Sequence, residues 1–266
     1  MQERSRSVPA SAPAFEIVCE IEPPTRPDLM HVRHQIGVLS KISAAFLIPD
    51  NHIGRATVSS VAVAHEVGLM GGRSIACLNA RDRNLLGFRR DLLTAAAYEV
   101  DQFLFVYGDR PSSGARTGQL TVRSMIEELR SFPFEDTRAP FRVGVTTASG
   151  NLPTWKQDAD FLFVQVCFSL EDALARRAAI DFDGPVSAGV MVVPSAAMAA
   201  KLAADVPHLA VPRHWIDAID GDPNAGVDLA CELVGALRES GAYDGVHLIP
   251  VSRYREVAAR LERDLA

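Results

Sequence analysis

The chain has 266 residues, of which 48% are hydrophobic, and its 27 basic and 33 acidic side chains give a formal net charge of −6. That length is enough for one sizeable core, and the mildly acidic balance gives no reason to expect a nucleic-acid surface. No apolar run approaches the ~20 residues of a membrane-spanning helix, and the widely spaced cysteines indicate buried free thiols in a reducing cytoplasm (Cys19, Cys77, Cys167 and Cys231).

The first fourteen residues are rich in Ser, Pro and Ala and lack the apolar stretch of a signal peptide. We therefore expect residues 1–14 to form a disordered leader. Residues 15–266 contain neither a recognisable linker nor an internal repeat, so we expect them to form one catalytic domain.

Apolar, β-rich runs recur along this domain, each typical of a parallel strand that is buried on both faces. The predicted strands are residues 15–21, 44–48, 74–78, 103–107, 141–147, 161–166, 186–193 and 246–251. Segments with helical periodicity lie between them, most clearly at residues 120–129, 227–237 and 254–265, and Gly241 supplies a helix stop. The connection at 148–160 has little room for a helix, whereas 194–245 has room for two or three.

Strict alternation of strands and helices predicts an α/β fold with right-handed crossovers and a parallel sheet. Eight such units favour a single closed (β/α)8 TIM barrel. A doubly wound open sheet is the alternative, but no Gly-rich phosphate loop follows the first strand.

In a barrel of this kind, the chemistry lies at the carboxyl ends of the strands. The first predicted strand ends in Glu20 and Glu22, which share one face because side chains alternate along a strand. If that face is the barrel interior, a carboxyl group at the rim could act as a general acid. If it is not, both are solvated charges at a strand end.

The third and fourth strands also lead into polar segments. After the third come Asn79, Arg81, Asp82, Arg83 and Asn84, which could hold an anion beside a helix N-terminus or could simply cap that helix through Asp82 or Asn84. After the fourth, Gly108 permits a sharp turn or a close approach to a ligand, with Asp109 pointing from the rim, or the segment is an ordinary turn.

Gln165 interrupts the apolar run that continues to Phe168. A buried amide needs hydrogen-bond partners, which a heterocyclic ligand, the backbone or a buried water could supply. His31 and His34 have helical i, i+3 spacing, but no third ligand accompanies them, so we predict no metal site.

Taken in chain order, these segments resemble the signatures of the methylenetetrahydrofolate reductases. The matching segments are Glu20-x-x-Pro23-Pro24, residues 81–84, Gly108-Asp109-x-Pro111, Gln165 and the final strand 246–248 leading to Arg253. Each motif is weak alone, but their order and spacing agree over nearly the whole chain after the leader.

The resemblance implies an enzyme that reduces 5,10-methylenetetrahydrofolate to 5-methyltetrahydrofolate with NAD(P)H, NADH being favoured, and that feeds methionine synthesis in the cytoplasm. Glu20 would be the general acid that helps to open the imidazolidine ring to a 5-iminium cation, and Asp109 would stabilise that cation. The implied folate-binding residues are Gln165, Phe168 and Arg253, and the implied cofactor-binding residues are Asn79, Arg81, Arg83 and Tyr107.

The resemblance also implies FAD over the barrel mouth, but the flavin-contact positions of the family differ in this chain. Cys77 stands where the family has a histidine, Tyr107 where it has an arginine, and Ala148-Ser149-Gly150 where it has Tyr-Pro-Glu. The long helix after the fifth strand also lacks room. We therefore predict direct hydride transfer from the nicotinamide, without FAD. The alternatives are a conventional FAD-dependent reductase and a folate-binding protein without turnover.

Overall fold

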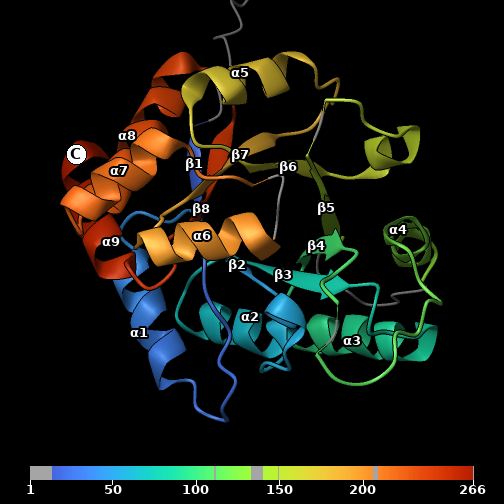
Figure 1. The fold of residues 1–266 in the computed structure, drawn as a ribbon. Helices are drawn as coiled ribbons and strands as arrows, with labels where there is room; N and C mark the ends of the chain where they lie inside the picture. Colours follow the sequence, from blue (N-terminus) through green and yellow to red (C-terminus); the bar gives the residue numbers. More distant parts are fainter. Residues whose placement is uncertain (1–13, 111, 133–139, 149, 206–208, 266) are drawn as a thin grey trace, which may run out of the picture.

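The computed structural model describes residues 14–110, 112–132, 140–148, 150–205 and 209–265. Within these residues, parallel strands follow one another around a closed barrel in chain order, and the last strand pairs with the first (Figure 1). The strands are β1 (Glu16–Glu20), β2 (Ala45–Ile48), β3 (Ser74–Asn79), β4 (Gln102–Val106), β5 (Arg142–Thr147), β6 (Phe161–Val166), β7 (Val186–Met191) and β8 (Gly245–Ile249). The predicted (β/α)8 barrel is confirmed, and pairing of β1 with β8 excludes the open sheet.

Helices surround the barrel and cover the outer faces of its strands (Figure 1). They are α1 (Met30–Leu39), α2 (Ser60–Leu69), α3 (Leu85–Ala97), α4 (Val122–Ser131), α5 (Leu170–Ala178), α6 (Ala196–Asp205), α7 (Arg213–Gly221), α8 (Ala225–Ser240) and α9 (Tyr254–Leu265), with short 3-10 helices η1 (His52–Gly54) and η2 (Thr154–Asp158). The helix stop predicted at Gly241 is confirmed, since this residue follows α8 with a φ of 62°.

The two unusual connections are also as the sequence predicts. Between β7 and β8, the described residues form α6, α7 and α8. Between β5 and β6, they form no α-helix and only the 3-10 helix η2. Asn84 caps the N-terminus of α3, because its side chain accepts a hydrogen bond of 2.8 Å from the Gly87 N–H.

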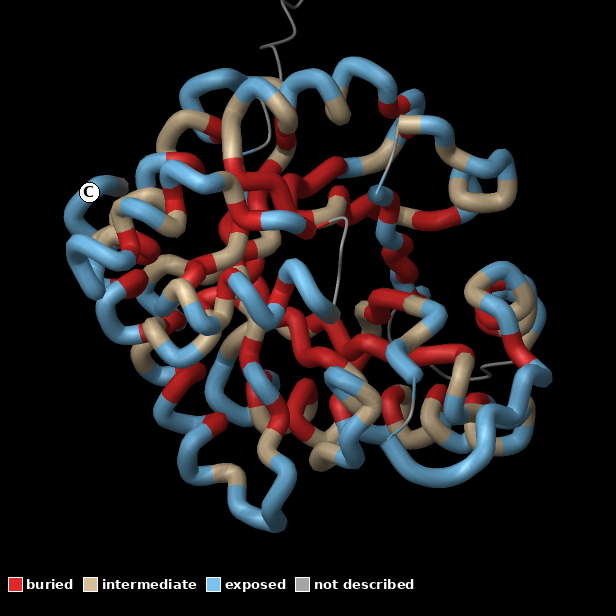
Figure 2. The backbone as a smooth tube through the Cα atoms, viewed as in Figure 1, coloured by how far each residue is buried: buried red, intermediate tan, exposed pale blue. Residues whose placement is uncertain are grey.

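The apolar core has an outer and an inner part. The outer part lies between the strands and the surrounding helices, and Figure 2 shows these buried strands inside a shell of exposed helix surfaces. The inner part fills the barrel itself and comprises Val18, Ala45, Leu47, Ile75, Cys77, Leu104, Phe161 and Phe163. Gly144 on β5 makes room for this filling, because a Cβ atom there would collide with the Phe161 ring.

The inner core determines which side chains reach the carboxyl end of the barrel. Side chains alternate along a strand, so Glu20 shares the inward face with Val18, and Gln165 shares it with Phe163. Apart from Ala14, the predicted leader lies outside the described residues. No helix in the described ranges is both long enough and apolar enough to cross a membrane.

Candidate active site

A cavity of about 560 Å³ opens at the carboxyl ends of the barrel strands. We call it the mouth cavity. Its floor is apolar and is formed by Leu47, Cys77, Leu104 and Phe163. Its polar lining residues are Glu20, Asp50, His52, Asp109, Thr146, Thr147, Lys156, Gln165 and His247. The structure thus brings Glu20, Asp109 and Gln165 to one opening, although they come from three separate parts of the chain.

Glu20 lies beside a histidine from the last strand. Its Oε2 is 3.3 Å from Nε2 of His247, and the exposed fractions of the two side chains are only 17% and 12%. The contact is an ion-pair distance without hydrogen-bond geometry, since His247 Nε2 has no hydrogen-bond partner in the described structure. The imidazole stacks on the Phe163 ring with centroids 5.3 Å apart. A carboxyl group and an imidazole therefore lie side by side on a wall that is largely shielded from water.

Glu22 differs from Glu20 in its surroundings. β1 ends at Glu20, and Glu22 beyond it is exposed and does not line the mouth cavity. The alternation rule that places both residues on one face applies only while the strand continues.

Asp109 stands on the rim, where the chain leaves β4. Gly108 before it has a φ of 91°, and a Cβ atom there would press on the Asn79 side chain at 2.8 Å. The Asp109 Oδ2 accepts a hydrogen bond of 2.9 Å from the Ile53 N–H in η1. Its Oδ1 accepts no hydrogen bond within the described residues. One carboxylate oxygen therefore binds η1 at the rim, and the other can contact a ligand in the mouth cavity.

Gln165 sits at a bulge in β6. The pairing of β6 with β7 shifts register between Val164 and Val166, and the Gln165 Oε1 accepts a hydrogen bond of 3.1 Å from the Val166 N–H. This contact orients the amide, and within the described residues its Nε2 donates to no other group. The amide N–H groups of Gln165 are therefore free to donate to a ligand in the mouth cavity.

Two of the predicted cofactor-binding residues are tied into a buried network beside the mouth. Asn79 donates from Nδ2 to Asp50 at 2.7 Å and to Asp82 at 3.0 Å. Arg83 binds Asp50 and, at 2.8 Å, Asp91. Burial acts to lower the pKa of the Arg83 guanidinium, but these two carboxylates raise it above its ordinary value. Asn79 and Arg83 thus hold the loop before α3 in place through these donors.

The other two predicted cofactor-binding residues contact each other on the outer side of the rim. The Arg81 guanidinium carbon lies 4.6 Å from the centroid of the Tyr107 ring, a cation–π distance. Tyr107 is 40% exposed, and neither residue lines the mouth cavity.

Two of the predicted folate-binding residues lie elsewhere. Phe168 is buried and meets Trp215 of α7 edge to face, with ring centroids 5.1 Å apart. Arg253 donates to the Pro223 carbonyl at 3.2 Å and to Asn224 Oδ1 at 2.6 Å, which fastens the start of α9 to the segment before α8. Neither side chain lines the mouth cavity.

The structure adds polar cavity residues that the sequence reasoning did not single out, among them His247 and Lys156. His247 interrupts the apolar run of β8 as Gln165 interrupts that of β6, so the same signal could have found it. Lys156 of η2 carries no such signal. Its Nζ donates to the Thr146 carbonyl at 2.6 Å, and burial lowers the pKa of its ammonium group.

All four cysteines are buried. Burial is the largest cause that raises the pKa of Cys77 well above its ordinary value, and the charges of Glu20 and Asp50 raise it further. Burial also raises the pKa of Cys19 and Cys231 to about 12 and that of Cys167 to about 11. These side chains are therefore neutral thiols near pH 7, and the thiolate is the reactive form.

We expect the native protein to react only slowly with 5,5′-dithiobis(2-nitrobenzoate) at pH 7.5, because neither access nor ionisation favours attack. After unfolding in guanidinium chloride, all four thiols should react at once, and the absorbance of the released thionitrobenzoate measures both values. A thiol that reacts within seconds in the native protein would contradict this description of the core.

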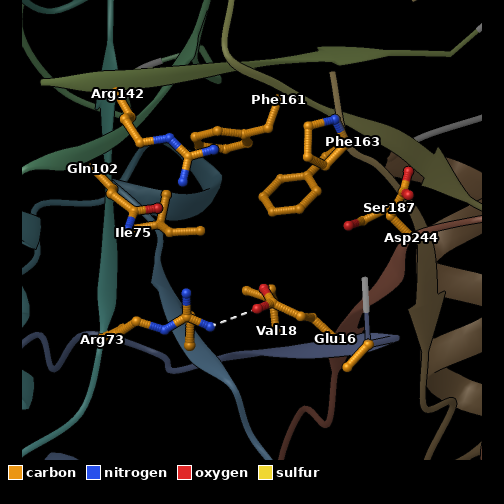
Figure 3. A pocket seen from close by; sticks show the side chains of 13 residues that line it. Glu16, Val18, Arg73, Ile75, Gln102, Arg142, Phe161, Phe163, Ser187 and Asp244 are labelled. Atoms are coloured by element: carbon orange, nitrogen blue, oxygen red, sulfur yellow. Dashed lines mark hydrogen bonds and ion pairs between the residues drawn. The ribbon is translucent and has the colours of Figure 1, made fainter. Parts of the chain in front are cut away.

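A second cavity, of about 260 Å³, opens at the opposite end of the barrel (Figure 3). Glu16 and Arg73 form an ion pair of 2.8 Å across its edge, and the Arg142 guanidinium lies 5.8 Å from the Phe161 ring centroid. Phe163 lines both cavities, so its ring lies between them. Because the amino end of a barrel generally carries stabilising contacts rather than chemistry, we assign the active site to the mouth cavity.

No protein-family model and no curated sequence matches the chain. An uncharacterised protein from Clostridium thermocellum that binds two copies of 5-methyl-5,6,7,8-tetrahydrofolic acid is similar in structure, with a TM-score of 0.64, 13% identity and 95% of each chain covered. A mutant Rhizomucor miehei β-1,3-glucanosyltransferase has a TM-score of 0.55 at 9% identity, covering 88% of this chain and 86% of its own. A mutant Pyrococcus furiosus tryptophan synthase α-subunit has a TM-score of 0.53 at 14% identity, covering 94% and 96%. At such identities the likeness establishes the barrel fold alone.

Proposed function

We propose that this protein reduces 5,10-methylenetetrahydrofolate to 5-methyltetrahydrofolate with NAD(P)H, NADH being favoured, and does so without FAD. The observation that carries the proposal is the composition of the mouth cavity. A carboxyl group paired with an imidazole stands on its wall, and a second carboxylate stands on its rim (Glu20, His247 and Asp109). These are the groups that the reaction requires, because it needs a proton donor and a stabiliser for a cation.

In the proposed mechanism, Glu20 donates a proton to N10 of the folate as the bond between N10 and the methylene carbon breaks. The electron pair of N5 forms the double bond of the 5-iminium cation, and Asp109 stabilises its positive charge. A reduced nicotinamide, when bound, would supply the hydride that converts the methylene carbon into a methyl group. His247 lies 3.3 Å from Glu20 on the same wall. The balance is methylenetetrahydrofolate, NADH and a proton giving methyltetrahydrofolate and NAD⁺.

Two observations support a folate as the ligand. The Nε2 of Gln165 lies in the mouth cavity without a partner among the described residues, as an amide that recognises a pterin would. In addition, the similar Clostridium thermocellum protein binds 5-methyltetrahydrofolic acid, which is the product of the proposed reaction.

The residues of this chain do not fit FAD in the manner of the resembling family. The position of the flavin-contacting histidine is Cys77, whose buried thiol belongs to the cavity floor. The position of the arginine is Tyr107, whose ring packs against Arg81. The described residues between β5 and β6 form η2 in place of a long helix. The iminium cation is itself a hydride acceptor, so direct transfer needs no intermediate carrier.

We expect the purified protein to lack the visible absorbance of a bound flavin and still to oxidise NADH when methylenetetrahydrofolate is added. An absorbance spectrum and a stopped assay at 340 nm measure the two properties separately. Stoichiometric copurifying FAD, or turnover that appears only after FAD is added, would refute the flavin-free mechanism and restore the conventional one.

A folate-binding protein without turnover is the second candidate, because the similar Clostridium thermocellum protein binds 5-methyltetrahydrofolic acid. Binding of 5-methyltetrahydrofolate by calorimetry, combined with no NADH oxidation over hours, would favour it. Retention of Glu20 beside His247 favours the enzyme, since binding alone needs no proton donor.

A further inference from the structure

A third cavity, of about 750 Å³, lies on the outer side of the rim, and we call it the arginine cavity. The segments before α3 and before α4 form it, and its described lining residues are Arg81, Arg110, Ser112, Ser113, Gly114 and Arg116. Within the described residues, none of the three arginines forms an ion pair with a carboxylate, whereas Arg83 nearby binds both Asp50 and Asp91. The arginine cavity is thus a concentration of uncompensated positive charge on a chain whose net charge is −6.

Two of the three arginines, Arg81 and Arg116, lie against an aromatic ring. The guanidinium carbons of Arg81 and Arg116 lie 4.6 Å and 5.7 Å from the centroid of the Tyr107 ring. The Arg81 N–H also donates to the Tyr107 carbonyl at 3.1 Å, and the buried Nε of Arg81 has no hydrogen-bond partner in the described structure. A buried guanidinium nitrogen without a partner is costly unless a ligand supplies an acceptor.

The arginine cavity adjoins the mouth cavity along the chain. Asp109 lines the mouth cavity, and the next residue, Arg110, lines the arginine cavity. The same stretch is fastened to η1, because Asp109 accepts from the Ile53 N–H at 2.9 Å and both the N–H and the hydroxyl of Ser112 donate to the Gly54 carbonyl at 2.8 Å. One ligand can therefore place a ring in the mouth and a charged tail beyond the rim.

We infer that the arginine cavity binds the diphosphate of the nicotinamide dinucleotide whose ring enters the mouth, an inference that rests on the function proposed above. Guanidinium groups match the geometry of phosphate oxygens with paired N–H donors, and the hydroxyl of Ser113 adds a neutral donor. A folate carries its own anionic tail in its glutamate carboxylates, which arginine also binds. The two sources share this chemistry, and the experiment below separates them.

The test measures binding without turnover, by calorimetric titration of the full-length protein with ADP-ribose, which carries the diphosphate but no nicotinamide. Arg110 and Arg116 are exposed, so the double variant Arg110→Gln/Arg116→Gln leaves the core intact. Since each charge-assisted hydrogen bond contributes substantially, we expect the variant to bind ADP-ribose about ten- to a hundredfold more weakly. The affinity of the wild type should also fall steeply with added salt.

Arg213→Gln is the matched control, because Arg213 is an exposed arginine on α7 that pairs with Asp217. This control should leave the affinity for ADP-ribose unchanged. The wild type and the double variant should bind 5-methyltetrahydrofolate triglutamate equally well. Equal ADP-ribose affinity in the wild type and the double variant would overturn the inference, as would a loss confined to the triglutamate. If the double variant binds ADP-ribose more weakly but the wild type does not oxidise NADH, the proposed reductase activity is refuted while the proposed diphosphate site is supported.

Discussion

Replacing Glu20 with Gln should lower the rate of NADH oxidation about 10²–10⁴-fold while folate affinity changes little. The substitution keeps the size and planarity of the side chain and removes the proton that the ring-opening step requires. Because the Glu20 side chain is 17% exposed and faces His247, water cannot easily replace it as the acid. Single-turnover kinetics at saturating substrate measure the chemical step, and calorimetry with 5-methyltetrahydrofolate measures the affinity.

Glu22→Gln is the matched control, because Glu22 is an exposed carboxylate that follows the same strand and does not line the cavity. Its turnover should equal that of the wild type. Near-normal turnover of Glu20→Gln would mean that another group is the acid. His247 would then be the first candidate, since its imidazole lies 3.3 Å from the same carboxylate.

The second large effect is expected at Asp109, where Asn should slow the chemical step by about 10²-fold. An amide oxygen can still accept the 2.9 Å hydrogen bond from the Ile53 N–H, so the rim should keep its shape while the negative charge is lost. The loss of rate should appear in kcat, because the positive charge develops only as the ring opens.

Asp109→Ala separates the charge from the rim contact, because it removes both. If Asp109 stabilises the cation, Asn and Ala should share the loss in kcat, and Ala alone should also raise KM by loosening η1. A normal kcat in Asp109→Asn, with only a higher KM for the folate, would show instead that the carboxylate merely positions the ligand.

The barrel could be predicted because its signals are local. Strands buried on both faces must be continuously apolar, and amphipathic helices must repeat their apolar residues every three or four positions. β6 therefore lies where its apolar run predicts, at Phe161–Val166, and the other strands begin and end within two residues of their predicted limits. The short connection at 148–160 was likewise evident from its length and from Gly150 and Pro153.

The sequence by itself determined the barrel and the strand ends near which Glu20, Asp109 and Gln165 reach the mouth, because a continuous apolar run marks where a buried strand begins and ends. Only the tertiary structure decided which partners the polar groups have. Arg83 and Arg81 are two residues apart, yet Asp50 and Asp91 occupy Arg83 while Arg81 lies against Tyr107. His247 meets Glu20 because closure of the barrel pairs β8 with β1, which joins the two ends of the chain in a register that no local pattern encodes.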